Sequence, residues 1–118
     1  MIALREIVDV YTVAASATPG DSQNVTASVN SNVSLKCTIQ TADPLRWKLF
    51  LENSTQFLTI FSGTQLNPTF QRFTVKTDED TGQSEMTIHN LQYEDSGTYF
   101  CDFINGTVIY FTLTVIGQ

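Results

Sequence analysis

The side chains that could carry covalent chemistry are few in this sequence, and they do not form a reactive set. His89 is the only histidine among the 118 residues, so no second imidazole can complete a zinc site or an acid–base pair. An acidic run, Asp78-Glu79-Asp80, precedes Thr81-Gly82 and is typical of a solvated hairpin turn. A calcium site would need more oxygen ligands in a defined order. The sequence therefore predicts no catalytic residue, no metal site and no cofactor.

Two cysteines, Cys37 and Cys101, allow only one pairing. In a cytosolic protein the simpler interpretation would be a pair of buried free thiols. The sequence also holds four Asn-x-Ser/Thr acceptor sequences for N-glycosylation, which favour a secreted or cell-surface protein in which a disulfide can persist. These four candidate glycosylation sites are Asn24, Asn32, Asn53 and Asn105.

The charge balance limits the classes of partner. Acidic residues outnumber basic ones by 12 to 6, the formal net charge is −6, and no basic run is present. A nucleic-acid partner is disfavoured because phosphate binding depends on clustered Lys and Arg. Contact with an anionic membrane surface is disfavoured for the same reason. A protein ligand is compatible with this charge balance.

The hydropathy pattern contains no membrane span. No apolar run approaches the ~18 residues that cross a bilayer, and Arg5, Glu6 and Asp9 interrupt any apolar segment after Met1, so no signal peptide is expected. We therefore interpret residues 1–118 as one domain, the extracellular domain of a type I membrane protein. Its transmembrane segment would lie elsewhere in a longer precursor and would provide the only membrane contact.

Apolar and polar residues alternate in short runs that are separated by turn residues, which predicts an all-β sandwich of about nine strands without a helix. Residues 14–23 are expected to form a loop that turns at Pro19-Gly20-Asp21, and residues 63–69 to be irregular. The expected strands are residues 7–13, 25–29, 33–39, 45–50, 56–62, 70–76, 84–89, 98–105 and 107–115.

The segment before the second cysteine carries a specific motif. Asp95, Gly97, Tyr99 and Cys101 follow the pattern Asp-x-Gly-x-Tyr-x-Cys, and Trp47 follows the first cysteine after a short interval. Together with Leu91, these residues make the chain similar to an immunoglobulin variable-type (V-set) domain over nearly its whole length. The long interval between the cysteines leaves room for the two extra strands of a variable-type domain.

This resemblance implies roles for several residues. Cys37 and Cys101 would form the single disulfide between the two sheets, with Trp47 packed against it. Leu91 and Tyr99 would join Trp47 in the core, and the Tyr99 hydroxyl would bond to the backbone near the preceding turn. The resemblance also implies a salt bridge between Arg72 and Asp95.

The sequence departs from the family pattern at three places. Residues 1–15 precede the usual start of the domain and form an N-terminal extension or an elongated first strand. Phe50 stands where the family often has Gln. The last strand, Ile109 to Val115, lacks the Phe-Gly-x-Gly of rearranging antigen receptors. This absence argues against an antibody or T-cell receptor domain and favours a germline-encoded receptor.

One sheet face is the expected binding surface. If Trp47, Tyr99 and Cys101 point inward, their neighbours in alternation point outward and form an apolar patch with a charged border. Several apolar side chains on one sheet face usually mark an interface, and V-set domains commonly dimerise through this sheet. The predicted dimer or partner face consists of Arg46, Lys48, Phe50, Phe100, Asp102, Ile104, Val108 and Tyr110. The short loops 41–44, 63–67 and 104–107 are the other candidate, although a glycan on Asn105 would obstruct them.

Two receptor types resemble the chain. One is the alpha-chain family of T-cell co-receptors, which bind class I MHC as homodimers. The resemblance to this family is based on Tyr110-Phe111 and on the run from Phe57 to Phe61. That resemblance implies that Arg5, Arg46 and Lys48 would meet an acidic MHC loop. The alternative is the variable-type innate receptors of fish leukocytes, and a third class is a homophilic adhesion molecule. We favour the co-receptor, with a fish as one candidate source.

Overall fold

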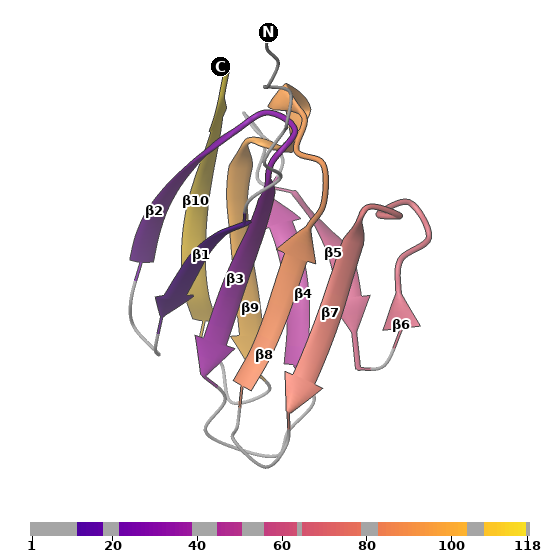
Figure 1. The fold of residues 1–118 in the computed structure, drawn as a ribbon. Coiled ribbons are helices and arrows are strands. Elements are labelled where there is room, and N and C mark those ends of the chain that lie inside the picture. Colours follow the sequence, from indigo (N-terminus) through magenta and orange to yellow (C-terminus); the bar gives the residue numbers. More distant parts are fainter. Residues whose placement is uncertain are drawn as a thin grey trace, which may run out of the picture.

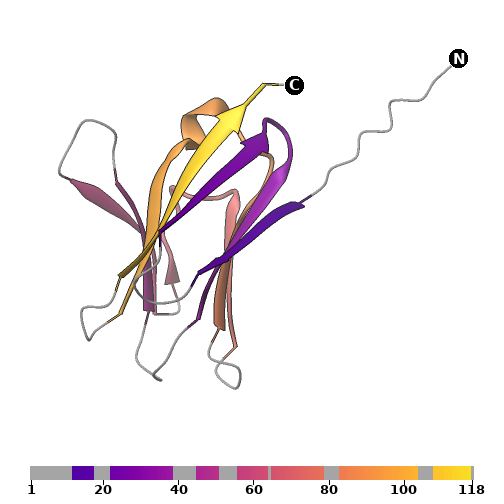
Figure 2. The ribbon, with the colours of Figure 1, turned by 90° about the vertical axis from the view of Figure 1, so that its left-hand side faces the viewer.

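The computed structural model describes residues 12–17, 22–38, 45–50, 56–63, 65–78, 83–103 and 108–117. These residues form two β-sheets that pack face to face around one core, as Figure 1 and the rotated view in Figure 2 show. The all-β V-type sandwich is confirmed, with ten strands in place of about nine. No helix among the described residues is long and apolar enough to span a bilayer.

The smaller sheet has the strand order β1-β3-β8-β7, and the larger has the order β2-β10-β9-β4-β5-β6. The strands of the smaller sheet are β1 (Thr12–Ala17), β3 (Asn32–Thr38), β8 (Gln83–Ile88) and β7 (Phe73–Asp78). Those of the larger sheet are β2 (Ser22–Ser28), β10 (Val108–Ile116), β9 (Gly97–Phe103), β4 (Leu45–Phe50), β5 (Phe57–Ser62) and β6 (Gln65–Leu66).

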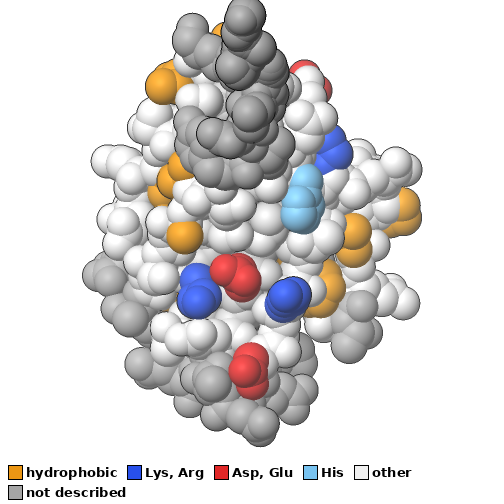
Figure 3. Space-filling view, viewed as in Figure 1, with side chains coloured by type: hydrophobic (Ala, Val, Ile, Leu, Met, Phe, Trp, Pro, Cys, Tyr) orange, Lys and Arg blue, Asp and Glu red, His pale blue; other side chains and the backbone are white. Residues whose placement is uncertain are grey.

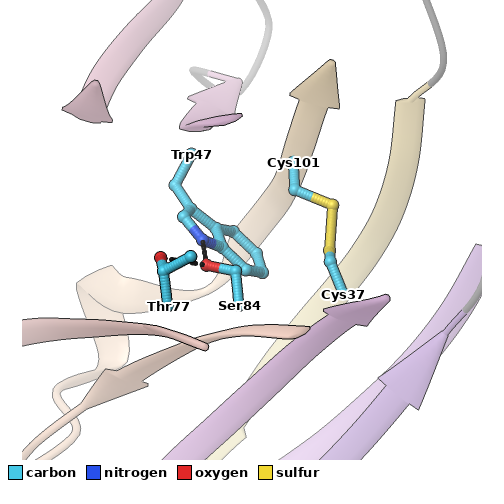
Figure 4. Close-up of a disulfide and its surroundings, with 5 residues drawn as sticks. All are labelled: Cys37, Trp47, Thr77, Ser84 and Cys101. Carbon is cyan, nitrogen blue, oxygen red and sulfur yellow. Dashed lines mark hydrogen bonds between the residues drawn. A yellow bond between two sulfur atoms is a disulfide. The ribbon is translucent and has the colours of Figure 1, made fainter. Parts of the chain in front are cut away.

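The disulfide between Cys37 in β3 and Cys101 in β9 joins the two sheets, as predicted. Trp47 pairs with Cys101 across β4 and β9, is fully buried and lies beside the disulfide (Figure 4). Its indole N–H donates to the Ser84 hydroxyl at 3.1 Å, and that hydroxyl lies 3.3 Å from the hydroxyl of Thr77. The buried indole N–H therefore has the partner that a buried donor requires.

A short 3-10 turn, η1 (Tyr93–Asp95), holds the polar corner of the fold between β8 and β9. Both carboxylate oxygens of Asp95 accept from the Arg72 guanidinium at 2.8 Å, and one of them also accepts the Gln92 backbone N–H at 2.8 Å. The Tyr99 hydroxyl donates to the Asp95 carbonyl oxygen at 2.6 Å. Leu91, directly before the turn, is fully buried. The corner therefore ties β7, η1 and β9 together at one end of the sandwich.

These contacts shift the pKa values of Arg72 and Tyr99. The hydrogen bonds that the Arg72 guanidinium donates to the Asp95 carboxylate raise the pKa of Arg72 and keep it charged, although burial acts in the opposite direction. Burial, helped by the nearby Asp95 charge, raises the pKa of the Tyr99 phenol well above its usual value. Tyr99 is therefore a neutral hydrogen-bond donor in the folded protein throughout the physiological range.

The variant Tyr99→Phe should lose about 1–2 kcal/mol of unfolding free energy at neutral pH, because the buried Asp95 carbonyl loses its donor. The folded pKa of Tyr99 lies above the unfolded value of about 10, so the advantage of the wild type is complete below that pH and shrinks as the pH rises past it. Urea unfolding of both proteins between pH 7 and 11 checks this. A gap that widens with pH would contradict it.

The start of the fold differs from the sequence prediction. Residues 14–17 were expected in a loop but belong to β1, which pairs in parallel with β3, and β2 begins at Ser22 instead of residue 25. β1 turns small side chains toward the core, namely Val13, Ala15 and Ala17. Alanine has low strand propensity, so this prediction was wrong because pairing with the free edge of β3 outweighs propensity. Residues 7–11 of the expected first strand lie outside the described residues.

Two smaller differences concern the segment between β5 and β7. Residues 65–66, within a segment expected to be irregular, pair with β5 as the two-residue strand β6. Residues 70–72 were expected to begin a strand, but they form a turn in which the Phe73 N–H donates to the Phe70 carbonyl. Phe70 and Phe73 pack edge to face across this turn with ring centroids 5.1 Å apart, and this contact stabilises the turn.

Candidate protein-binding face

Cross-strand pairing brings most of the predicted face residues together on the outer face of the larger sheet. In β9, the residues from Thr98 to Phe103 each pair with one residue of β4, and those from Gly97 to Asp102 each pair with one residue of β10. Paired residues point to the same side of the sheet. The three resulting rows are Arg46–Asp102–Val108, Lys48–Phe100–Tyr110 and Phe50–Thr98–Thr112.

Four aromatic rings on this face pack against one another and are called the aromatic cluster below: Phe50, Phe57, Phe100 and Tyr110. Phe100 is central, with ring centroids 5.0 Å from Phe50, 6.1 Å from Phe57 and 5.6 Å from Tyr110. Phe57 is 48% exposed and Tyr110 37% exposed, whereas Phe100 is only 5% exposed. The exposed apolar surface of the cluster therefore comes from its outer rings.

This burial corrects the prediction that Phe100 itself offers an apolar contact surface. The side chain does lie on the outer face, but its neighbours cover it. Rings that hold one another in offset and edge-to-face contacts lose little further freedom when a partner binds. Phe100 thus supports the exposed rings of Phe57 and Tyr110.

An ionic group borders the aromatic cluster. Asp102 accepts from Arg46 at 2.9 Å and from the Lys48 ammonium at 3.0 Å. The same ammonium lies 4.2 Å from the Phe57 ring centroid and 5.9 Å from that of Phe100, a cation–π arrangement. Two cations share one carboxylate, so the border carries local positive charge on a chain whose net charge is −6.

The two cations differ in what they can contact. Lys48 is only 7% exposed, so it offers little surface for the predicted contact with an acidic partner. Its ammonium is already held by Asp102 and two aromatic rings. The Arg46 side chain is 42% exposed while it contacts Asp102. Arg46 is therefore the cation of this face that a partner can reach.

Phe57 was absent from the predicted face. It pairs with Phe50 across β4 and β5, and the two rings make an edge-to-face contact at 6.3 Å. The available signal was the short connection between these strands, because an antiparallel pair with Phe50 and Phe57 opposite each other places both on one face. The register also shifts between Trp47 and Lys48, which sequence alternation cannot reveal.

The remaining candidate residues are more scattered. Val108 is half-buried at the start of β10. Asn24 is exposed on β2, and Asn32 is half-buried with its Oδ1 accepting the Asn90 N–H at 3.0 Å. The other candidates lie outside the described residues: Arg5, Asn53, Ile104 and Asn105.

The outer face of the smaller sheet is chemically different. Its central row is the charge ladder Lys36–Glu85–Lys76, seen as the blue, red and blue side chains across the middle of Figure 3. Next to it, the Ser34 and Thr87 hydroxyls bond at 2.7 Å. His89 is exposed at the end of β8, 3.1 Å from the Thr74 hydroxyl. In the described part of the chain, exposed aromatic rings thus occur on only one of the two sheet faces.

A model of the immunoglobulin V-set domain family matches residues 20–115, which span both sheets, the disulfide and the polar corner. This chain is a member of the immunoglobulin V-set family. The V-set match begins after β1, so β1 precedes the part that the family model describes. V-set domains are typically extracellular or cell-surface modules and are generally not enzymes, which is consistent with an immune-receptor-type ectodomain.

The V-set domain is also similar to a solved structure, the first immunoglobulin domain of the mouse polymeric immunoglobulin receptor. The TM-score is 0.73 at 20% sequence identity, and the alignment covers 86% of this chain and 97% of the mouse domain. At this identity the similarity supports the fold alone. No curated protein matched the sequence.

Proposed function

We propose that this V-set domain is the ligand-binding ectodomain of a cell-surface immune receptor and that it binds a protein through the aromatic cluster. The single observation that carries the proposal is the exposure of Phe57 and Tyr110 around a packed ring cluster, opposite a sheet face that carries a charge ladder. Aromatic and Arg side chains are the enriched anchors of protein interfaces. Here both kinds of side chain lie on one face.

The first partner of this face is a second copy of the chain, in a homodimer. A two-fold arrangement would place the aromatic cluster of one copy against the same surface of the other and remove both from water. The exposed Arg46 lies at the border of the cluster, where charged groups fit the polar rim of an interface.

The ligand proposed for the receptor is class I MHC, which makes the chain a T-cell co-receptor. This rests on the resemblance of Tyr110-Phe111 and of Phe57 to Phe61 to the co-receptor alpha chains. Arg46 supports it as the exposed cation that could meet an acidic loop. A germline-encoded innate receptor of the fish type and a homophilic adhesion molecule are the alternatives that the ligand test below distinguishes.

A glycan placed in the aromatic cluster tests the face. The variant Tyr110→Asn creates an Asn-x-Thr acceptor sequence that Phe111 and Thr112 complete, so a secretory host can attach a bulky glycan at the position of an exposed ring. We expect the dimer dissociation constant to rise at least ~100-fold, or about 2.7 kcal/mol. Analytical ultracentrifugation over a concentration series measures it, and glycopeptide mass spectrometry verifies occupancy.

The matched control is Tyr110→Asn with Thr112→Ala, which keeps the asparagine but removes the acceptor hydroxyl. This control should lose only the contribution of the Tyr110 ring, about 10-fold in affinity. A wild-type mass of one chain at the highest concentrations would contradict the homodimer. If the glycosylated variant binds as well as the control, the face assignment is wrong.

The ligand is tested by surface-plasmon resonance with class I MHC of the same species, at concentrations up to ~100 μM, which suit weak receptors. Saturable binding that Arg46→Glu removes would support the co-receptor proposal. Absence of binding by the folded wild type would contradict it and would favour the innate receptor. Homophilic binding between chains on opposing cells would favour the adhesion molecule.

A further inference from the structure

The same sheet face carries a candidate glycosylation site next to the aromatic cluster. We propose that an N-glycan on Asn24 covers the polar half of this face, so that only the half that carries the aromatic cluster stays open to a partner. The partner side of this inference rests on the proposed function. The part of the inference that concerns the glycan depends only on the position of Asn24.

Strand pairing fixes the side of the sheet on which Asn24 lies. In β2, Val25 and Ala27 are buried, whereas Asn24 and Thr26 are exposed. Asn24 pairs with Thr112 and Ser22 pairs with Tyr110, so Asn24 points to the same side as Tyr110. The acceptor amide is therefore on the outer face, and the Thr26 hydroxyl of its sequon points the same way.

The surroundings of Asn24 form a surface of small polar side chains. We call this surface the polar half, and it consists of Ser22, Asn24, Thr26, Thr112 and Thr114. All five are exposed. Hydroxyl-rich surface without large apolar groups contributes little to a dry interface core, but it accommodates a solvated glycan. Ile116, also on β10, is exposed beyond this surface, where it pairs with Ser28.

The distance from Asn24 to the aromatic cluster can be estimated along one straight row of paired residues. This row runs Asn24–Thr112–Thr98–Phe50–Phe57 across five adjacent strands. At roughly 4.8 Å per strand, Asn24 lies about 14 Å from Phe50 and about 19 Å from Phe57. Tyr110, offset by two residues on the neighbouring strand, is only about 8 Å away. A glycan on Asn24 would thus border the cluster at Tyr110 and leave Phe57 free.

The other described sequon does not affect this face. Asn32 lies in β3 of the smaller sheet, where its Oδ1 accepts the Asn90 N–H, and the Ser34 hydroxyl of the sequon bonds to Thr87. Asn24 is thus the described sequon whose glycan would share a surface with the aromatic cluster. The inference predicts that a partner approaches from the β5 side of the sheet.

The test moves the glycan across the sheet in single steps. The protein is secreted from a mammalian host as wild type, as Asn24→Gln, and as Asn24→Gln with Thr112→Asn, which creates an acceptor sequence completed by Leu113 and Thr114. We expect Asn24 to be occupied and its removal to change the dimer dissociation constant less than 3-fold. The glycan at position 112, one strand nearer the cluster, should weaken the dimer about 10-fold. Asn24→Gln with Thr112→Gln is the control without an acceptor at either position and should behave as Asn24→Gln.

A second measurement does not depend on any partner. Hydroxyl-radical footprinting of monomer at low concentration should show more labelling of Ile116 or Tyr110 after the Asn24 glycan is removed, with no change at Phe57. An unoccupied Asn24 would overturn the inference, and so would a Phe57 signal that rises with the others. A 10-fold change of affinity in Asn24→Gln would place Asn24 inside the interface and overturn it too. Failure of the Tyr110→Asn test alone would leave the footprint result standing, so the two proposals fail separately.

Discussion

Replacement of Cys37 and Cys101 by alanine is expected to lower the free energy of unfolding by about 4 kcal/mol. The disulfide closes a loop between residues 64 positions apart, and in the chain-entropy estimate a loop of this length is worth that amount. A domain of this size has a total stability of about 5–15 kcal/mol. The variant should therefore remain folded at 25 °C but unfold at a much lower urea concentration. Emission of Trp47, the only tryptophan, reports the transition because its ring is fully buried beside the disulfide.

Two comparisons separate the cross-link from packing. The wild-type protein reduced with a thiol keeps both sulfur atoms and should lose nearly the same stability as the double alanine variant. Cys37→Val with Cys101→Ala restores part of the buried volume and should recover less than about 1 kcal/mol if the cross-link dominates. Recovery of most of the loss by this variant would contradict the entropic account and assign the effect to the core.

The residues that fix the fold are recognisable in the sequence because their chemistry is local. Asp95, Gly97, Tyr99 and Cys101 lie within one turn and one strand, and their spacing already dictates which side chains meet. The tight turn before the second cysteine forms η1, and the strand with Trp47 has the predicted bounds. Hydrophobic alternation then determines one buried face for each strand, which suffices to predict the two-layer architecture.

The parts that could not be predicted depend on neighbours that are distant in sequence. β1 forms because β3 would otherwise have a free edge. The alanine-rich sequence of β1 has low strand propensity and gives no indication that it pairs with β3. Phe100 and Lys48 alternate outward, as the sequence indicates, yet rings from β4, β5 and β10 cover them. Alternation predicts the side of the sheet to which a side chain points, whereas the exposure of that side chain depends on the size of its cross-strand neighbours.

This distinction changes what the proposed binding face offers. The sequence predicts a flat set of outward apolar residues with two cations available to an acidic partner. In the fold, Phe100 and Lys48 support the surface from below, and Phe57, Tyr110 and Arg46 form what a partner would meet. Substitutions of the first pair should act mainly through stability, and those of the second group mainly through binding. Measuring both properties for each variant therefore separates support from contact.

The variant Asp95→Ala is expected to lower the unfolding free energy by about 3 kcal/mol, which makes it one of the most damaging single substitutions in the chain. Asp95 is buried, and its carboxylate accepts both Arg72 donors and the Gln92 N–H. Removing one partner of a buried ion pair leaves the other charge without compensation, at a cost of about 3–5 kcal/mol. The lower value applies because the Arg72 side chain is one-third exposed and can turn to water.

A double-mutant cycle isolates the ion pair from the rest of the corner. Arg72→Ala should cost less than Asp95→Ala, because Asp95 also accepts the Gln92 N–H, which remains after the arginine is gone. The double variant Arg72→Ala with Asp95→Ala should be more stable than the sum of the two single losses predicts, by about 1–2 kcal/mol, since no unpaired charge is left. Urea titrations followed through Trp47 emission measure all four corners of the cycle. Strict additivity would show that Asp95 acts through the turn alone and that the ion pair with Arg72 contributes nothing of its own.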